Sequence, residues 1–105
     1  MKKGDIILVP FPFTDLTGAK NRPALVLFSN NLDITLSFIS TQLKWEEKTD
    51  VLLNPSQENG LKKESLLRLS KIATIERSLV LGKLGELNSF DLKKVDKNLK
   101  NLFDI

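Results

Sequence analysis

The chain has 105 residues and a mass of 11.8 kDa, and it contains no histidine, no cysteine and no tyrosine. This length is typical of one domain, so we expect residues 1–105 to form a single domain around one hydrophobic core. The absences exclude a histidine-based catalytic triad or acid–base pair, a zinc site of cysteine and histidine, and thiol redox chemistry. A magnesium site would need clustered carboxylates, and no tight cluster of Asp or Glu stands out, so we expect neither metal nor cofactor.

Charge is unevenly distributed between the two parts of the chain. Residues 1–60 hold six basic and seven acidic residues, a net of −1, whereas residues 61–105 hold ten and six, a net of +4. A basic C-terminal part favours an anionic partner such as nucleic acid, although lysines on the solvent face of a helix would give the same count. The N-terminus lacks an apolar run long enough for a signal peptide or a membrane span, and cysteine is absent, so we expect a cytoplasmic protein without membrane contact.

Six short apolar segments, each bounded by turn residues, predict β-strands. The expected strands are residues 6–9, 24–28, 34–38, 50–54, 65–72 and 79–85. The third alternates strictly, which predicts Ile34, Leu36 and Phe38 on a buried face and Thr35 and Ser37 on the solvent face, and it runs on towards residue 42. Six strands of this length and spacing predict a small twisted, partly closed β-barrel.

After residue 85 the hydrophobic period changes from that of a strand to that of a helix. Asn88 is placed to cap a helix, with Asp91 three positions later and Leu87 able to pack onto Leu92. The apolar residues then recur at spacings of three and four, at Leu92, Val95, Leu99 and Leu102. This pattern predicts one amphipathic C-terminal helix of about four turns, packed on the barrel, so the fold class is mainly β with one α-helix.

The first two strands are joined by residues 11–21, a long connection for so small a domain. Prolines and phenylalanines can pack this loop down, whereas the polar side chains of Asp15, Thr17 and Lys20 stay free to face a ligand. Loops of this length in small domains are usually functional or disordered. We therefore expect the three polar residues to belong to a binding site.

Two arginines lie where strands are expected. Arg22 precedes a proline, so its backbone is extended, and it can bind a phosphate through two hydrogen bonds while staying charged at any physiological pH. A surface ion pair with Asp15 or Asp33 is the structural alternative for this residue. Arg68 lies on one strand face with Ser70, and it can either discourage edge-to-edge aggregation or belong to an anion-binding surface.

Polar residues also follow the third strand. Ser40, Thr41 and Gln42 can hydrogen-bond a phosphate or the edge of a base, although such residues are ordinary at strand ends. Trp45, the only tryptophan, lies among charged residues. It can stack on a base, lie in a subunit interface or cover the barrel core.

Four segments of this sequence resemble the MazF/PemK family of toxins from type II toxin–antitoxin systems, in particular its PemK-like branch. They are residues 4–15 (GDIILVPFPFTD), 22–27 (RPALVL), 65–75 (SLLRLSKIATI) and 83–85 (KLG). The resemblance covers nearly the whole chain in order, so it is more specific than any single motif. It implies an SH3-like barrel with a C-terminal helix, in agreement with the pattern of strands and helix above.

The resemblance implies a homodimeric, metal-independent endoribonuclease that cuts single-stranded mRNA at short sequences and stops growth. It also implies a cognate antitoxin whose acidic tail fills the RNA groove, and repression of the operon through binding of the toxin–antitoxin complex to operator DNA. By position in the family motifs, Arg22 and Thr41 form the catalytic centre, Ser40 and Gln42 line it, and Arg68 contacts RNA. Ser70, on the strand face of Arg68, is expected to contact RNA as well. The polar residues of the long loop are then expected to contact RNA as well.

The chemistry implied is attack of a ribose 2′-hydroxyl on its own adjacent phosphate, which yields a cyclic phosphate and a free 5′-hydroxyl. Arg22 would stabilise the charge that grows on the phosphate oxygens, and Thr41 would donate a hydrogen bond to them. Because the chain offers no histidine, the rate should show no inflection at about pH 6.5. Single strands are the expected substrate because only unpaired bases expose their edges.

Two other functions fit the same resemblance. The chain could be a non-catalytic toxin that binds and poisons a protein such as DNA gyrase, through the helix end at Leu99, Leu102 and Phe103. It could also retain only antitoxin binding. Ser70 is the single hint of the latter, because many relatives carry an acidic residue at that position and the serine puts any role for an acid there in doubt.

Overall fold

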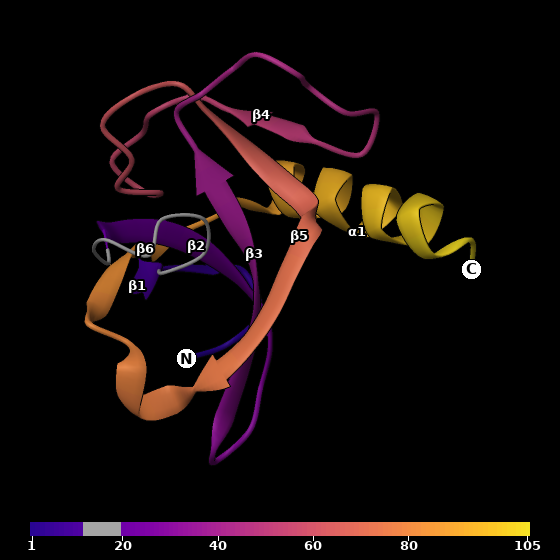
Figure 1. The fold of residues 1–105 in the computed structure, drawn as a ribbon. Coiled ribbons are helices and arrows are strands. Elements are labelled where there is room, and N and C mark those ends of the chain that lie inside the picture. Colours follow the sequence, from indigo (N-terminus) through magenta and orange to yellow (C-terminus); the bar gives the residue numbers. More distant parts are fainter. Residues whose placement is uncertain (12–19) are drawn as a thin grey trace.

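In the computed structural model, which describes residues 1–11 and 20–105, six antiparallel strands form one sheet followed by a C-terminal helix (Figure 1). The strands lie in the order β4-β5-β3-β2-β1-β6, so each end of the sheet is formed by a short strand. The elements are β1 (Asp5–Phe11), β2 (Lys20–Ser29), β3 (Asp33–Ser40), β4 (Val51–Leu53), β5 (Ser65–Glu76), the 3₁₀ turn η1 (Arg77–Leu79), β6 (Gly82–Glu86) and α1 (Ser89–Phe103). The mainly β fold with one C-terminal helix is therefore confirmed.

The sheet curls into a half-barrel, and the segment between β4 and β5 closes one side of it (Figure 1). The backbone N–H of Glu86 in β6 donates to the carbonyl oxygen of Glu58 at 2.7 Å. Gly60 has a positive φ of +69°, and a Cβ there would overlap the carbonyl group of Leu84. A Cβ on Gly85 would likewise overlap the backbone of residues 58 and 59, so this closure requires glycine at both positions.

Successive strand residues point to opposite faces, and both faces of the sheet carry buried apolar side chains. On the face covered by α1, which we call the helix face, the core includes Ile6, Leu25, Ile39, Leu67 and Val95. On the opposite face, which we call the Arg22 face, it consists of Ile7, Val9, Ala24, Val26, Ile34 and Leu36.

Helix α1 packs against β4 and β5, and its beginning matches the expected cap. The side-chain oxygen of Asn88 accepts a hydrogen bond from the N–H of Asp91 at 2.8 Å, which satisfies one of the free donors of the first turn. Leu92, Leu99 and Leu102 pack against the helix-face core, as their spacing predicted. No helix among the described residues is long and apolar enough to cross a membrane.

Three local expectations were wrong. Ser37 is fully buried rather than solvent-facing, because β3 is a central strand covered on both sides, and its hydroxyl donates to the carbonyl oxygen of Leu69 at 3.2 Å. The sixth strand begins at Gly82, since η1 precedes it. The third strand ends at Ser40, so Thr41 lies just beyond it rather than inside an extended strand.

Candidate functional site

The register of the sheet brings Arg22 and Ser40 to the same end of two neighbouring strands. Ala24 in β2 pairs with Phe38 in β3, so Arg22, two residues before Ala24, and Ser40, two residues after Phe38, share one face and one sheet end. Thr41 follows Ser40 directly. The structure therefore brings the two predicted catalytic residues, Arg22 and Thr41, to one end of the half-barrel.

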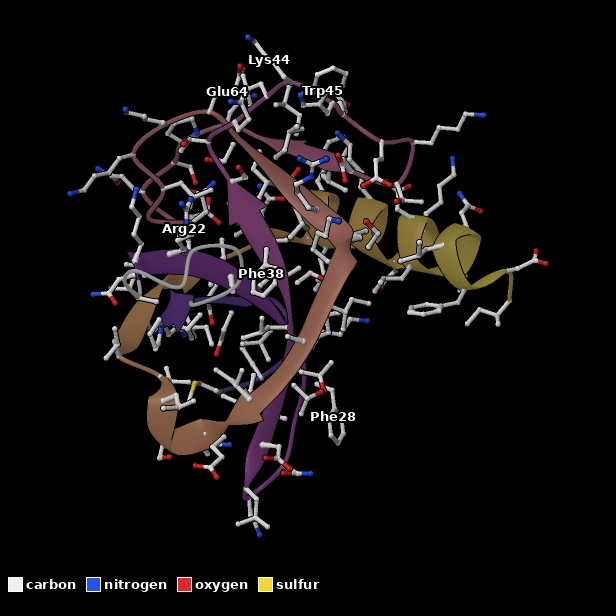
Figure 2. The ribbon with its side chains drawn as sticks, viewed as in Figure 1. Arg22, Phe28, Phe38, Lys44, Trp45 and Glu64 are labelled. Carbon is white, nitrogen blue, oxygen red and sulfur yellow. The ribbon has the colours of Figure 1, made fainter. Side chains whose placement is uncertain are left out.

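Arg22 is exposed at the rim of the Arg22 face (Figure 2). It pairs across the sheet with Val9 in β1, which is fully buried, so the strand pairing fixes its backbone. Within the described part of the chain its guanidinium forms no ion pair, so Asp33 is not its partner. Lys20, two residues earlier on the same strand face, is also exposed, and the two cations form a positive strand end.

The residues after β3 form a turn stabilised by their own side chains. The Ser40 hydroxyl oxygen accepts a hydrogen bond from the Gln42 N–H at 3.0 Å, and the Gln42 side-chain oxygen accepts one from the Lys44 N–H at 3.2 Å. Thr41 lies between these bonds with an exposed side chain that makes no hydrogen bond to a described residue. Its hydroxyl is therefore available as a donor, whereas part of the hydrogen-bonding capacity of Ser40 and Gln42 is already used.

Arg68 lies in β5 opposite Phe38, but its guanidinium is engaged inside the molecule. Its Nη2 donates to the carbonyl oxygen of Trp45 at 2.8 Å and lies 3.7 Å from Glu47 Oε1. Its Nε lies 3.6 Å from Asp50 Oδ2, and the side chain is only 16% exposed. This side chain therefore fastens the loop after β3 to β5, which the sequence did not predict.

Ser70 is also directed to this loop. Its hydroxyl donates to Glu47 Oε1 at 3.1 Å, so the loop places a carboxylate beside position 70. Ser70 is 23 positions from Glu47 in the sequence, and Arg68 is 21 positions from it. Such contacts can be predicted only when the pairing register of the strands is known. Asp15 and Thr17, predicted to bind RNA, lie outside the described residues.

A separate charged cluster lies where β1 meets β6. The Lys83 ammonium bonds Glu86 at 3.1 Å and lies 3.4 Å from the buried carboxylate of Asp5. The hydrogen bond to Glu86 raises the pKa of Lys83 by more than desolvation lowers it, and the charge of Asp5 adds to the increase. Hydrogen bonds from Lys83 and Lys2 lower the pKa of Glu86. These groups bind one another and are structural.

Across the described residues, no group of three or more His, Cys, Asp or Glu side chains is arranged to hold a metal ion. The groups available at this end of the sheet are the exposed guanidinium of Arg22 and the exposed hydroxyl of Thr41, neither of which is bound by another described side chain. Such a pair can bind a phosphate and stabilise negative charge on its oxygens.

Comparison with known proteins adds the family. Residues 2–103 match the family of PemK-like, MazF-like toxins of type II toxin–antitoxin systems. The chain belongs to this toxin family. A comparison with curated protein sequences finds no match.

Solved structures of the MazF type share the fold. The Mycobacterium tuberculosis toxin MazF-mt6 superposes with a TM-score of 0.79 at 21% identity, covering 96% of this chain and 97% of that one. An endoribonuclease from a mycobacterial species, in complex with its cognate antitoxin, gives 0.74 at 18% identity, with coverage of 100% and 94%. Another mycobacterial endoribonuclease gives 0.75 at 18% identity, with coverage of 100% and 92%. The chain is thus a MazF-type toxin in fold and family.

Proposed function

We propose that this toxin is a metal-independent endoribonuclease that cleaves single-stranded mRNA at short sequences and thereby inhibits translation and growth. The observation that carries the proposal is the position of Arg22, a strand-held, exposed guanidinium without a carboxylate partner among the described residues, at the sheet end where Thr41 lies. Membership of the MazF-type toxins supports it, as does the description of two structural neighbours as endoribonucleases.

The proposed reaction is an internal transesterification. The ribose 2′-oxygen attacks the adjacent phosphorus, the bond from phosphorus to the 5′-oxygen breaks, and the 2′-proton is lost while the 5′-oxygen gains one. The products are a 2′,3′-cyclic phosphate and a 5′-hydroxyl end. The substrate supplies its own nucleophile, which suits a chain without histidine or cysteine.

In this reaction Arg22 stabilises the negative charge that grows on the non-bridging phosphate oxygens. A guanidinium stays protonated at any physiological pH, so Arg22 acts by charge and position rather than as a base. Thr41 donates a hydrogen bond to the same phosphate. The preorganised charge of Arg22 is worth roughly 3–4 kcal/mol in the transition state, whereas the single hydrogen bond from Thr41 is worth about 1.4 kcal/mol.

The neighbouring polar residues are proposed to bind the RNA around the scissile phosphate. Lys20 supplies positive charge on the strand face of Arg22, and Ser40 and Gln42 shape the turn that presents Thr41. Arg68 contributes by holding the loop after β3, which Ser70 also contacts. Asp15 and Thr17 are proposed as RNA contacts on the sequence argument.

A cognate antitoxin with an acidic tail is the proposed protein partner, and a structural neighbour in complex with its antitoxin supports this. An acidic tail would compete with RNA for the exposed charges of Lys20 and Arg22. We further propose that the toxin is a cytoplasmic homodimer and that the toxin–antitoxin complex binds operator DNA.

The proposal is tested with purified protein and a long single-stranded RNA in the presence of a chelator. We expect discrete fragments, and growth arrest when the toxin is expressed without its antitoxin. An inactive Arg22→Ala preparation controls for contaminating ribonuclease. Equal cleavage by the two proteins would contradict the assignment of Arg22.

A groove at the C-terminal end of α1 supports a second candidate, a non-catalytic toxin that binds a protein target such as DNA gyrase. The groove has a volume of about 510 Å³ and lies between the helix and the helix face of the sheet. Its apolar lining includes Leu27, Ile72, Leu99 and Phe103, the last of which is 56% exposed. Intact RNA together with growth arrest that survives Arg22→Ala but not Phe103→Ala would favour this candidate.

A further inference from the structure

Trp45 is the most exposed large hydrophobic residue of the loop that follows β3. Its side chain is 83% exposed, which excludes a role in covering the barrel core. In Figure 2 the indole lies at the outer end of the loop beside Lys44 and points away from the sheet. An aromatic ring held in solvent lacks the burial that would stabilise it, so its position calls for an explanation.

The backbone of Trp45 is held in an unusual conformation. Its φ is +66°, in the left-handed region that bulky residues rarely adopt. The carbonyl oxygen of this same residue accepts the 2.8 Å hydrogen bond from Arg68 Nη2. Arg68, itself fixed in β5, therefore holds the strained turn that presents the indole.

The rest of the loop is fastened from two sides. The Asp50 carboxylate accepts a hydrogen bond from the Glu47 N–H at 2.8 Å, and Asp50 is itself 93% buried beside Arg68. Asn98 of α1 donates to the carbonyl oxygen of Thr49 at 3.2 Å. Sheet and helix thus fix the loop before any ligand binds, which lowers the entropy cost of using it for binding.

From these observations we propose that Trp45 is a base-stacking platform for single-stranded RNA and that Arg68 is the positioning residue that presents it. The inference rests on the proposed function, because it places an RNA strand at Arg22 and Thr41. Trp45 is four residues after Thr41, at most about 14 Å along the chain. A nucleotide next to the scissile phosphate can therefore reach the indole.

The surroundings of Trp45 favour RNA over a protein partner. Its neighbours in the sequence are two lysines and two glutamates, Lys44, Glu46, Glu47 and Lys48, and the Glu47 carboxylate is bound by Arg68 and Ser70. The centres of protein interfaces, by contrast, are depleted of charged residues. Aromatic rings next to cations are typical of surfaces that bind single strands. Since every base has a stacking face, Trp45 adds affinity for RNA without selecting its sequence.

Fluorescence gives a direct test, because Trp45 is the only tryptophan and the chain has no tyrosine. The probe is a short mixed-sequence oligoribonucleotide with 2′-O-methyl groups throughout, which cannot be cleaved. We expect binding to quench the emission and to protect it from acrylamide. If the protein cleaves RNA but saturating probe leaves the emission unchanged, the inference fails and the proposed function stands. If the protein neither cleaves RNA nor binds the probe, both fail.

Variants separate stacking from a structural role. Trp45→Ala should weaken binding of the labelled probe by roughly 5- to 150-fold, the value of one stacked base, and raise KM while kcat stays constant. Trp45→Phe should restore most of the affinity. Phe28, another exposed aromatic residue at 56%, lies far from Trp45 in Figure 2, so Phe28→Ala is the matched control and should change nothing. Wild-type RNA affinity in Trp45→Ala, with weakened binding of a protein partner, would overturn the inference.

The role of Arg68 has its own readout. Arg68→Lys keeps the charge but loses the planar fork, so the indole should rotate more freely in time-resolved anisotropy of its emission. The affinity for the probe should fall in the same variant. Unchanged anisotropy and affinity would show that Arg68 does not position Trp45.

Discussion

Arg22 and Arg68 lie in strands of one sheet, and both were predicted to contact RNA, yet their surroundings differ. Arg22 is exposed and forms no ion pair with a described residue. Arg68 is 16% exposed and lies within 4 Å of the carboxylates of Glu47 and Asp50. The difference teaches that an arginine surrounded by the protein's own acids stabilises the structure, whereas one without them is free to bind a substrate anion.

The largest expected effect is on catalysis, at Arg22. Arg22→Ala should lower the cleavage rate by roughly 10²- to 10³-fold, because one preorganised charge at the phosphate is lost. Its unfolding midpoint should be unchanged, because the side chain is exposed and unpaired among the described residues. Rates from RNA cleavage and midpoints from urea unfolding check both parts. A large loss of stability would break the contrast with Arg68.

At Arg68 we expect the main effect on the free energy of unfolding rather than on the cleavage rate. Arg68→Ala leaves the buried Asp50 carboxylate without its cation and should lower the free energy of unfolding by about 3 kcal/mol, at the low end for buried ion pairs. Adding Asp50→Asn should recover part of this loss, because the unpaired charge is then gone. Lys71→Ala, an exposed cation of the same strand, is the matched control and should be neutral. A loss below about 1 kcal/mol for Arg68→Ala would sink this account.

Thr41 should have a smaller effect than either arginine. Thr41→Val removes the hydroxyl with little change of shape and should slow cleavage about tenfold, the value of one hydrogen bond to the phosphate. Thr41→Ser keeps the hydroxyl and should retain most of the activity. Steady-state cleavage of one RNA by the three proteins is the measurement. Equal rates would remove Thr41 from the centre.

The smallest effect concerns the cluster at β6, away from both arginines. The pKa of Glu86 is lower in the folded chain than its ordinary value of 4.5, mainly because Lys83 donates a hydrogen bond to it. Its stabilising contribution is thus complete above pH 4.5 and is lost as the pH falls through the folded pKa. Urea midpoints over this range should fall slightly less steeply for Glu86→Gln than for wild type. Identical slopes would show that this exposed pair contributes nothing.

Much of the fold was predictable from local patterns. The alternation of Ile34, Leu36 and Phe38 with polar residues predicted β3. The capping residue Asn88, followed by apolar residues at spacings of three and four, predicted α1. The burial of Ser37 was not predictable, because alternation assigns two faces but does not say that α1 covers the second one. The order of the strands and the position of the helix depend on contacts between residues far apart in the sequence, which local patterns do not show.

The candidate site also has a part that was predictable from the sequence and a part that was not. Arg22 and Thr41 could be chosen from motif positions, and the pairing of Ala24 with Phe38 then places them at one sheet end. The contacts of Arg68 with residues 45–50 could not be predicted, because they depend on an irregularity in the pairing of β3 with β5. Ser37 pairs with Ile72, but the next residue of β3, Phe38, pairs with Arg68. Such shifts leave no clear signal in a single sequence.

The most direct test of the central claim is to map the ends produced in one long RNA by primer extension and to identify their chemistry. We expect cuts at one short recurring sequence in the presence of chelator, with 5′-hydroxyl and 2′,3′-cyclic phosphate ends, and a loss of these products by roughly 10²- to 10³-fold with Arg22→Ala. Uncut RNA, or fragments that carry 5′-phosphate ends, would contradict it.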